Sequence, residues 1–363
     1  MMAKIKTAVL GATGTVGQRF VSLLASHPWF ELVAVAASPA SAGKRYADAV
    51  RGRWTPAVEV PTPVAGLTLA RALEDRGAVA ADVELAFSAL DLDKETTRAV
   101  EEEYAASGVA VVSANSAHRW TEDVPMIIPE INAGHVALVD GQRARRRWGR
   151  GLLAVKPNCS LQSYVPVVKA WERFAPQRVS VTTLQAVSGA GRTLDDWPEM
   201  RDNVIPYIPG EEEKSEREPL KILGAVNGRR IRLAQRPAFS ATCLRVPVSD
   251  GHLAAASIEF EKPATGDELR AALADFRPAT AGLDLPSAPE RFLYLYGDDD
   301  RPQPRRDRDV DGGMAVAVGR LHEDGGPRRW KFVALSHNTV RGAGGGAVLL
   351  AELLVAKGYI SPA

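Results

Sequence analysis

The sequence contains few cysteines and no long apolar run. Only two of its 363 residues are cysteine, Cys159 and Cys243, which is too few for a disulfide framework and fits a reducing compartment. No apolar run approaches the length of a membrane span, and Met1 to Lys6 leads straight into a strand pattern without a signal peptide. We therefore expect a cytoplasmic protein with no membrane partner.

An excess of charge of one sign is absent as well. The 45 Lys and Arg residues nearly balance the 44 Asp and Glu residues, so the formal net charge is +1 and no global field attracts nucleic acid. The Arg-rich run 143–150 is interpreted as a solvated surface loop, and we expect no nucleic-acid partner. The six histidines and two cysteines show no metal-ligand spacing, so we expect no metal. With 45% hydrophobic residues, the chain can form two domains, each with its own core.

The N-terminal residues follow the pattern of a dinucleotide-binding fold. An apolar strand over 7–10 leads into the glycine-rich segment 11–17, which has the spacing Gly-x-x-Gly-x-x-Gly, and an amphipathic helix pattern continues over 18–26. Glycines allow a tight turn and close approach of the backbone to a pyrophosphate, which the helix N-terminus attracts. The alternative is a glycine turn without a ligand. The residues expected to bind a cofactor here are Gly11, Thr13, Gly14, Thr15 and Val16.

The loop after the second predicted strand, 31–36, indicates which cofactor is bound. An NAD enzyme usually has an acidic residue there for the ribose 2′-hydroxyl, and the segment 37–45 has none. It offers Ser38, Ser41 and two basic residues instead, which suit a 2′-phosphate. NADP is therefore favoured over NAD, and a solvated loop is the alternative.

Further strands over 83–88 and 109–113 flank a predicted helix and continue the alternation of a doubly wound parallel sheet. Ser88 ends the first of these strands, and Arg119 follows the second. Ligands bind at the carboxyl ends of strands in such sheets. We expect Ser88 to lie near the cofactor and Arg119 to hold a phosphate.

A turn around Cys159 is the central chemical feature. An apolar strand pattern over 151–155 precedes it, and helical apolar spacing, interrupted by Pro166, follows over 161–171. The thiol therefore lies near a helix N-terminus, where backbone N–H groups and the helix dipole favour a thiolate and a developing oxyanion. A buried structural cysteine is the alternative.

The second half of the chain has a different pattern, with a β-branched strand over 179–186 and a tight turn after it. A highly charged helix pattern covers 210–223, in which Glu211 and Lys214 share one face. A solvated, salt-bridged face explains such a run equally well.

A second chemical cluster surrounds a strand predicted over 245–248. Arg245 is suited to bidentate binding of a carboxylate, and His252 to acid–base chemistry beside a cysteine. Strand patterns over 314–319 and 330–336 precede the glycine-rich segment 338–346 and a C-terminal helix. That segment predicts close backbone contact with a cofactor or with the first domain, and both can hold.

The sequence resembles the aspartate-semialdehyde dehydrogenases of the archaeal and fungal branch. The resemblance implies an α/β fold with an N-terminal Rossmann-like doubly wound domain, formed by 1–157 and 338–363. An α+β catalytic and dimerisation domain over 158–337 precedes the C-terminal helix, which returns to the first domain. The motifs that carry the resemblance are 11–17, 157–160, 185–191, 203–208, 211–223, 245–252 and 337–352.

The resemblance also implies residue roles. Cys159 is the nucleophile, His252 the acid–base residue, and Gln185 positions the acyl intermediate. The expected substrate ligands are Arg245 for the α-carboxylate, Glu211 for the amino group, and Lys214, Arg119 and Asn158 for the phosphate. Further cofactor contacts are expected from Ser188, Gly189, Asn338 and Gly342.

The implied reaction is NADP-dependent reductive dephosphorylation of 4-phospho-L-aspartate to L-aspartate 4-semialdehyde in a homodimer or homotetramer. A related acyl-phosphate or acyl-CoA reductase is one alternative. A non-catalytic nucleotide-binding paralogue is another, and the intact Cys159, Gln185, Arg245 and His252 argue against it.

The chain departs from the family pattern at a few positions. It has Ser113-Ala114-Asn115 where Ser-Asn-Ala is usual, and Leu350 where the family has an Asn that faces the nicotinamide. An Arg common in the serine-rich cofactor loop is missing, and the stretch 192–197 differs. These departures bear on cofactor contacts and acyl-substrate identity more than on the thiol chemistry.

Overall fold

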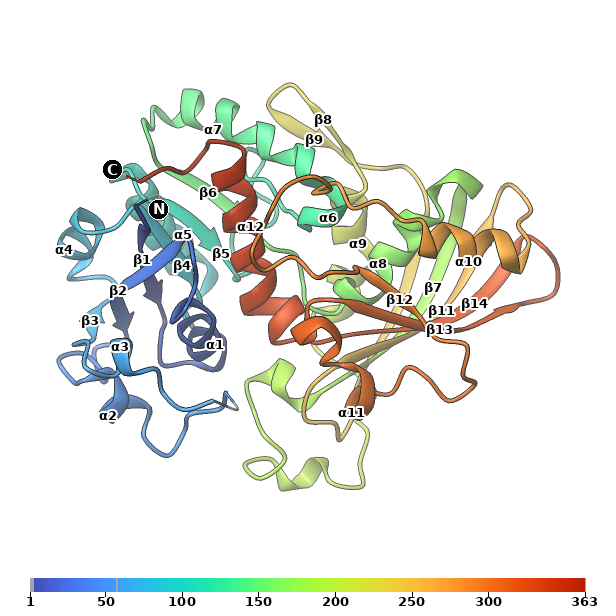
Figure 1. The fold of residues 1–363 in the computed structure, drawn as a ribbon, viewed down its shortest axis with the longest axis horizontal. Helices are drawn as coiled ribbons and strands as arrows, with labels where there is room; N and C mark the ends of the chain where they lie inside the picture. Colours follow the sequence, from blue (N-terminus) through green and yellow to red (C-terminus); the bar gives the residue numbers. More distant parts are fainter. Residues whose placement is uncertain (1–2, 57, 363) are drawn as a thin grey trace.

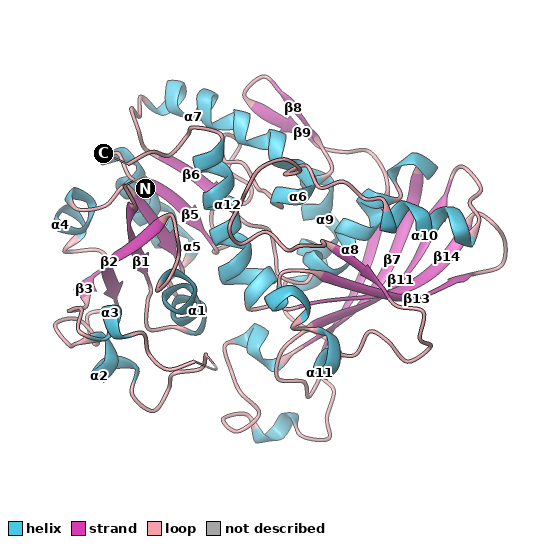
Figure 2. Ribbon diagram, in the orientation of Figure 1, coloured by secondary structure: helices cyan, strands magenta, loops and turns pink. Residues whose placement is uncertain are grey.

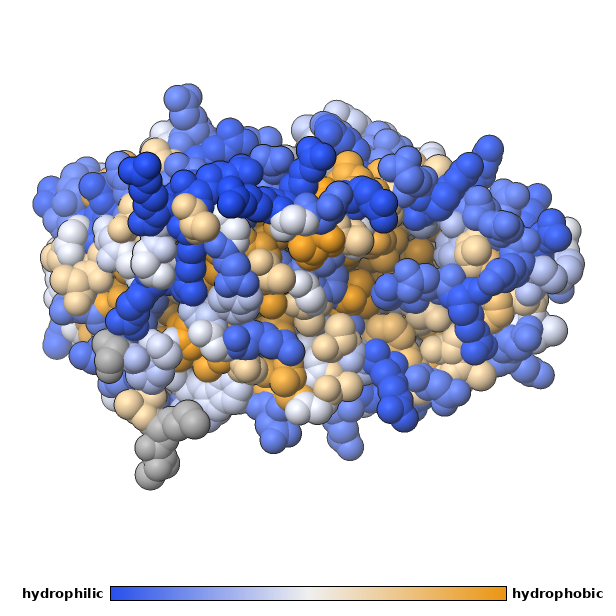
Figure 3. All heavy atoms as spheres, turned by 90° about the horizontal axis from the view of Figure 1, so that it is seen from above, coloured by the Kyte–Doolittle hydropathy of each residue, from blue (hydrophilic) through white to orange (hydrophobic). Residues whose placement is uncertain are grey.

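The structure is a computed structural model that describes residues 3–56 and 58–362, and it has two lobes (Figure 1). Each lobe contains a six-stranded sheet, and a small two-stranded sheet is separate from both. Helices surround the first sheet, whereas long strands dominate the second lobe (Figure 2). Seen from above, the surface is mostly hydrophilic, and hydrophobic side chains gather across its middle (Figure 3).

The first sheet is parallel throughout, in the order β3-β2-β1-β4-β5-β6. This order is that of a dinucleotide-binding fold and confirms the predicted doubly wound sheet. Its strands are β1 (Ile5–Leu10), β2 (Phe30–Ala37), β3 (Ala70–Arg71), β4 (Leu85–Ser88), β5 (Ala110–Ser113) and β6 (Leu152–Val155). The helices around it are α1 (Thr15–Leu24), α2 (Tyr46–Val50), α3 (Thr62–Ala65), α4 (Arg76–Ala81), α5 (Lys94–Ala106), α6 (Pro129–Asn132), α7 (Leu138–Arg146) and α12 (Gly345–Ala356).

The second sheet is mixed, in the order β10-β7-β11-β14-β13-β12, with parallel pairs only at its two edges. Its strands are β7 (Pro176–Gln185), β10 (Ala238–Arg245), β11 (His252–Phe260), β12 (Leu293–Leu295), β13 (Val316–Glu323) and β14 (Arg329–Ser336). The separate hairpin is formed by β8 (Ala225–Asn227) and β9 (Arg230–Arg232). The helices of this lobe are α8 (Leu161–Ala170), α9 (Glu211–Ile222), α10 (Gly266–Ala274) and α11 (Pro304–Asp307). Among the described residues, no helix is long and apolar enough to cross a bilayer.

Two predictions of local structure are wrong. The first half of the Arg-rich run belongs to the end of α7, where the helix dipole favours cations and Arg146 pairs with Asp123 at 2.8 Å. The strand predicted over 245–248 lies earlier in the chain, because β10 ends at Arg245. Pro247 has no N–H to donate to a sheet ladder and therefore cannot continue the strand.

The C-terminal helix α12 returns to the first lobe, as predicted. It runs through the middle of the molecule, between the two sheets (Figure 1), and packs against α1 and β5. Glu352 of this helix lies 2.9 Å from the ring of His27 in the first lobe. Leu350 is completely buried in the apolar core of that lobe. The expectation that this position faces the nicotinamide is therefore wrong in this structure, because the leucine packs into the core.

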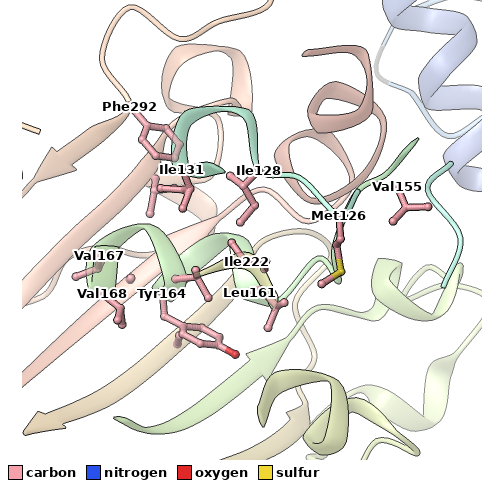
Figure 4. Close-up of a cluster of buried hydrophobic side chains, with 14 of the residues drawn as sticks. Met126, Ile128, Ile131, Val155, Leu161, Tyr164, Val167, Val168, Ile222 and Phe292 are labelled. Carbon is pink, nitrogen blue, oxygen red and sulfur yellow. The ribbon is translucent and has the colours of Figure 1, made fainter. Parts of the chain in front are cut away.

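A buried apolar cluster joins the two lobes (Figure 4). Leu161, Tyr164 and Val168 come from α8, and Val155 comes from the end of β6. Burying each such side chain stabilises the fold by roughly 1.5–3 kcal/mol. Because the cluster fixes both β6 and α8, the turn 156–160 between them has little freedom.

A buried ion pair holds the segment that enters α12. Both carboxylate oxygens of Glu130 accept hydrogen bonds from Arg341 at 2.5 Å, and neither side chain is more than 1% exposed. Glu130 lies on α6, at the edge of the first lobe. The pair therefore ties the entrance of the last helix to the first lobe.

We predict that Glu130→Gln lowers the free energy of unfolding by about 3–5 kcal/mol, because it leaves the buried Arg341 guanidinium without a counter-charge. Denaturant unfolding followed by circular dichroism measures this loss. Glu213→Gln is the matched control, since Glu213 pairs with Arg217 on the surface and should change stability little. Equal, small losses in the two variants would contradict the structural role of the buried pair.

Candidate active site

Cys159 lies in the turn between β6 and α8, at the carboxyl edge of the first sheet. The side chain of Asn158 closes this turn, since its Oδ1 accepts hydrogen bonds from Ser160 N at 2.9 Å and Ser160 Oγ at 2.7 Å. Cys159 is half-buried, and no hydrogen bond to its sulfur occurs among the described residues. The predicted position of the thiol before a helix is therefore confirmed.

Glu211 connects three of the predicted site residues. Its carboxylate accepts hydrogen bonds from Asn158 at 3.0 Å, from Lys214 at 2.7 Å and from Gln185 at 3.2 Å. Burial acts to raise the pKa of Glu211, but the Lys214 charge and these hydrogen bonds outweigh it and lower the pKa below its usual value. The group is therefore an anion at neutral pH, as an amine ligand requires.

Glu218 is a site residue that the sequence analysis did not identify. Its carboxylate is buried and accepts hydrogen bonds from Arg119 Nη1 at 2.9 Å and from the backbone N–H of Asn158 at 2.7 Å. A signal was present, because Glu218 follows Glu211 by two helical turns and so lies on the same face of α9. The solvated face of this helix is a different one, carried by Glu213 and Arg217.

Arg119 is buried and already paired, although it was expected to offer its charge to a phosphate. Besides Glu218, it contacts the carbonyl of Lys156 through Nε at 3.2 Å. A phosphate at this site would therefore share the guanidinium with a carboxylate rather than bind to a free one.

His252 and Arg245 meet at the backbone of Ala186. The Ala186 N–H donates to His252 Nδ1 at 3.1 Å, and the Ala186 carbonyl accepts from Arg245 Nη1 at 2.7 Å. Burial, followed by the Arg245 charge, lowers the pKa of His252 to about 3. A neutral ring that accepts at Nδ1 carries its proton on Nε2. That Nε2 is buried and has no partner among the described residues, so it can donate to a substrate oxygen.

Gly189 covers this pair closely. A Cβ atom at this position would lie 2.7 Å from Arg245 Nη1 and 2.9 Å from His252 Nε2. Only glycine therefore fits without moving these two groups. Gly189 was predicted to contact the cofactor, and the structure places it beside the predicted substrate residues.

The glycine-rich turn of the first lobe has the geometry that a dinucleotide requires. Gly11 adopts a φ of +80°, and a Cβ there would collide with the carbonyl of Ala89. A Cβ at Gly17 would collide with the carbonyl of Gly11, so this glycine lets α1 pack closely on the turn. Gly14 caps α1 and is exposed, and a Cβ there would make only an ordinary contact, 3.6 Å from the Gly11 carbonyl oxygen. The turn thus leaves backbone N–H groups accessible at a helix N-terminus, where a pyrophosphate fits.

The remaining predicted cofactor residues fall into three groups. Thr15 lies beside the loop 187–191, with its Oγ1 3.9 Å from the position of a Cβ on Gly191. Asn338 donates to Ser188 Oγ at 2.9 Å and accepts from the Gly251 N–H at 2.8 Å, so the segment after β14 is tied to the loop 187–191 and to the turn before β11. The others are Thr13 and Val16, which are partly exposed on the glycine turn, Ser38, which is exposed, and Ser41, which is buried.

In the segment Ser113-Ala114-Asn115, whose order differs from the family pattern, both polar side chains form hydrogen bonds. Asn115 Nδ2 donates to Ser88 Oγ at 3.1 Å and to the buried carboxylate of Glu101 at 3.0 Å. Ser113 donates to the same carboxylate at 2.7 Å. The ends of β4 and β5 are therefore linked by side chains, and Ser88 is already held by Asn115.

Gly342 lies against the turn that carries Cys159. A Cβ on Gly342 would approach the Cβ of Cys159 to 2.8 Å and its Cα to 3.2 Å. Burial and the Glu211 charge raise the pKa of the Cys159 thiol, while Lys156, Arg119 and Arg245 act to lower it. Among the described residues, no group of three or more potential ligand side chains could hold a metal ion.

Comparison with known proteins fits this geometry. Residues 6–139 match the profile described as "Semialdehyde dehydrogenase, NAD binding domain", and residues 166–341 match "Semialdehyde dehydrogenase, dimerisation domain". An aspartate-semialdehyde dehydrogenase of Archaeoglobus fulgidus is 42% identical over 98% of this chain and 100% of its own length. The chain belongs to the aspartate-semialdehyde dehydrogenase family.

Other members of this family show the same extent of similarity. An aspartate-semialdehyde dehydrogenase of Trichophyton rubrum is 41% identical over 99% of both chains. The crystal structure of the Candida albicans aspartate-semialdehyde dehydrogenase with NADP superposes with a TM-score of 0.87 at 37% identity, over 99% of this chain and 100% of that one. The archaeal and fungal resemblance inferred from the motifs is therefore confirmed.

We predict that Gly342→Ala lowers kcat by at least about tenfold, because the added methyl group displaces Cys159 from its position and small misplacements of a reacting group are costly. Gly77→Ala is the matched control, since its added methyl group would contact nothing within 4 Å. Steady-state kinetics and thermal melting of both variants separate a local effect from unfolding. Normal turnover by a folded Gly342→Ala enzyme would contradict the close contact.

Proposed function

We propose that this protein is an NADP-dependent aspartate-semialdehyde dehydrogenase. It catalyses the reductive dephosphorylation of 4-phospho-L-aspartate to L-aspartate 4-semialdehyde and phosphate. The observation that carries the proposal is the surroundings of Cys159: an accessible thiol at the carboxyl edge of a dinucleotide-binding sheet, electrostatically coupled to Arg245, Glu211 and Arg119. Few other chemistries need a thiol, a carboxylate-binding arginine and an amine-binding glutamate together.

Covalent catalysis by Cys159 divides the reaction into two easier steps. The thiolate attacks the acyl carbon of the substrate, the carbon–oxygen bond to phosphate breaks, and a thioester forms as phosphate leaves. Backbone N–H groups at the start of α8 lie where they can stabilise the oxyanion of this step. The Nε2–H of His252 is suited to donate a proton or hydrogen bond to the same oxygen.

Substrate recognition is assigned to charged groups on both lobes. Arg245 binds the α-carboxylate, and Glu211 binds the α-amino group. Gln185 donates to Glu211 at 3.2 Å and positions the acyl group from the same side. The phosphate is bound by Lys214, Arg119 and Asn158. These assignments are supported by the convergence of Gln185, Lys214, Arg119 and Asn158 on the Glu211 and Glu218 carboxylates of α9. Arg245 is held close by, at the carbonyl of Ala186, the residue after Gln185.

The cofactor binds to the glycine-rich turn, with contributions from Gly11, Gly14 and the N-terminus of α1. NADPH, when bound, supplies the hydride that reduces the thioester to the aldehyde. The NADP complex of the Candida albicans relative supports this choice. The exposure of Gly14 and the absence of an acidic side chain in the loop 37–45 agree with it.

The organisation of the whole protein follows the same assignment. We place the NADP-binding domain at 1–157 and 338–363 and the catalytic and dimerisation domain at 158–337, since α12 packs on α1 and β5. A homodimer or homotetramer is supported by the match to a dimerisation domain over 166–341. A cytoplasmic location suits an enzyme that depends on a reduced thiol, and both cysteines are free in the described structure.

We predict that Cys159→Ser abolishes turnover while NADP binding stays intact, because the thiol forms the covalent bond to substrate and is not a cofactor ligand. The assay follows NADPH formation from the aldehyde, phosphate and NADP+, and cofactor binding is measured by fluorescence quenching. Cys243→Ser is the control, since this second cysteine is fully buried, contacts the hydroxyl of Ser215 and should keep most activity when replaced by the similar serine. Substantial activity in Cys159→Ser would refute the mechanism, and activity only with acyl-CoA would change the substrate.

We predict that NADP is preferred over NAD by about tenfold or more in kcat/KM, which corresponds to ~1.4 kcal/mol of 2′-phosphate contact. Ser38→Asp should reverse this preference, because its carboxylate would repel the phosphate and accept from a ribose 2′-hydroxyl. Ser38→Ala is the matched control and should weaken NADP binding without favouring NAD. Equal kcat/KM for NADP and NAD in the wild type would show that the loop 37–45 does not recognise the 2′-phosphate.

A further inference from the structure

Lys156 is a buried lysine beside the nucleophile turn for which the mechanism above has no role. It follows directly after β6, only 3% of its surface is exposed, and its backbone N–H bonds to Ser113. Its ammonium nitrogen has one hydrogen-bond acceptor among the described residues, the carbonyl of Pro157 at 2.5 Å. The side chain therefore folds back over the turn that carries Cys159.

The number of hydrogen bonds made by the Lys156 ammonium can be compared with that of a second buried lysine, Lys221. Lys221 donates to three backbone carbonyls, those of Arg119 at 2.7 Å, Val124 at 3.1 Å and Thr121 at 3.4 Å. An ammonium has three N–H donors, so Lys221 is fully satisfied and Lys156 is not. A buried cation with unused donors is costly unless a negative charge lies close to it.

The groups that face Lys156 come from several elements. Arg119 and Arg341 oppose its charge, whereas Glu218 and a Cys159 thiolate favour it. Glu218 is already engaged by Arg119 and by the backbone of Asn158. The anion left to Lys156 is therefore the thiolate of Cys159.

The stem of Lys156 is held by the entrance to α12. The Cε of Lys156 lies 3.9 Å from the position that a Cβ on Gly346 would take. Gly342, four residues earlier in the same segment, lies against Cys159. The lysine and the cysteine are thus enclosed by the same glycine-rich segment. Because the Lys156 ammonium is buried, its charge interaction with the half-buried thiol is stronger than it would be in water.

We infer that Lys156 is a positioning residue whose ammonium group is the charge partner of the Cys159 thiolate and promotes its formation. The inference rests on Cys159 being the nucleophile of the proposed function. The inference also explains how a thiolate can form without a base at His252. The Nδ1 of His252 accepts from the Ala186 N–H, so the proton of the neutral ring is on Nε2 before the reaction. A ring in that state does not accept the thiol proton, so the thiolate must be stabilised by another group.

Electrostatics agree with this arrangement. Burial and then the Arg119 charge lower the pKa of Lys156 to about 7, and a Cys159 thiolate acts to raise it again. The Lys156 charge acts reciprocally to lower the pKa of the thiol, against burial and Glu211. Burial and Glu211 prevail, so the pKa of the thiol stays above its ordinary value, and Lys156 is the largest of the influences that limit this rise. Among the other groups near Cys159, His252 with a pKa of about 3 and Glu211 with a lowered pKa titrate well below this range.

The test is the pH dependence of Cys159 alkylation by iodoacetamide, which reads the thiolate without requiring turnover. Mass spectrometry of the peptide that contains Cys159 separates it from Cys243. In Lys156→Met, the midpoint should rise by about one pH unit and the rate at pH 7 should fall about tenfold, because the stabilising cation is lost. Lys156→Arg keeps the charge and should stay close to the wild type.

Lys221→Met is the matched control, since it also removes a buried ammonium but not one that faces the thiol, and its alkylation profile should equal that of the wild type. A Lys156→Met profile that superimposes on the wild type would overturn the inference. So would an equal shift in Lys156→Arg, because packing and not charge would then be responsible.

The wild-type protein gives a readout that does not depend on any variant being folded. A coupled amine and thiol lose their protons in two separate steps, so the alkylation rate should rise over a wider pH range than a single proton allows. A wild-type profile that fits one proton would contradict the pairing. Because alkylation is measured without substrate, its outcome is independent of whether Cys159→Ser loses turnover.

Discussion

Two buried carboxylates on α9 hold the turn that carries Cys159. Glu218 accepts from the backbone N–H of Asn158, and Glu211 accepts from the side chain of the same residue. The turn itself begins at the edge of the first sheet, whereas α9 belongs to the second lobe. The position of Cys159 therefore depends on contacts that cross between the lobes. Of the other predicted substrate ligands, Lys214 contacts Glu211 and Arg119 contacts Glu218, whereas Arg245 contacts the carbonyl of Ala186.

The ionisable groups of the site differ in their charge and in what balances it. Glu211 is kept anionic by Lys214 and by amide donors, so it can balance an amine, while Glu218 neutralises Arg119 within the protein. The ring of His252 is kept neutral by burial and Arg245. Most of the charge near the thiol is thus already balanced before substrate binds, whereas the one hydrogen bond of the Lys156 ammonium within the described part of the chain goes to an uncharged carbonyl.

The parts of the site that are contiguous in the chain could be predicted from the sequence. The glycine turn and the strand–Cys159–helix turn are examples, since spacing alone specifies their local conformation. Contacts between distant residues could not be predicted in this way. Arg119 meets Glu218 across 99 residues, and the Ala186 N–H reaches His252 across 66, so the pairing of one and the tautomer of the other depend on the fold. The strand at Arg245 was misplaced because the effect of Pro247 on the ladder was not considered.

The first lobe is built from both ends of the chain, because α12 packs against α1 and β5. The strands of its sheet precede the second lobe in the sequence, whereas Gly342, which lies against Cys159, and α12 follow it. The contact between His27 and Glu352 joins residues 325 positions apart. Contacts over such a sequence separation are slow to form because the loop between them must be closed. We therefore expect the first lobe and the surroundings of Cys159 to reach their final packing late in folding, after the second lobe has formed between them.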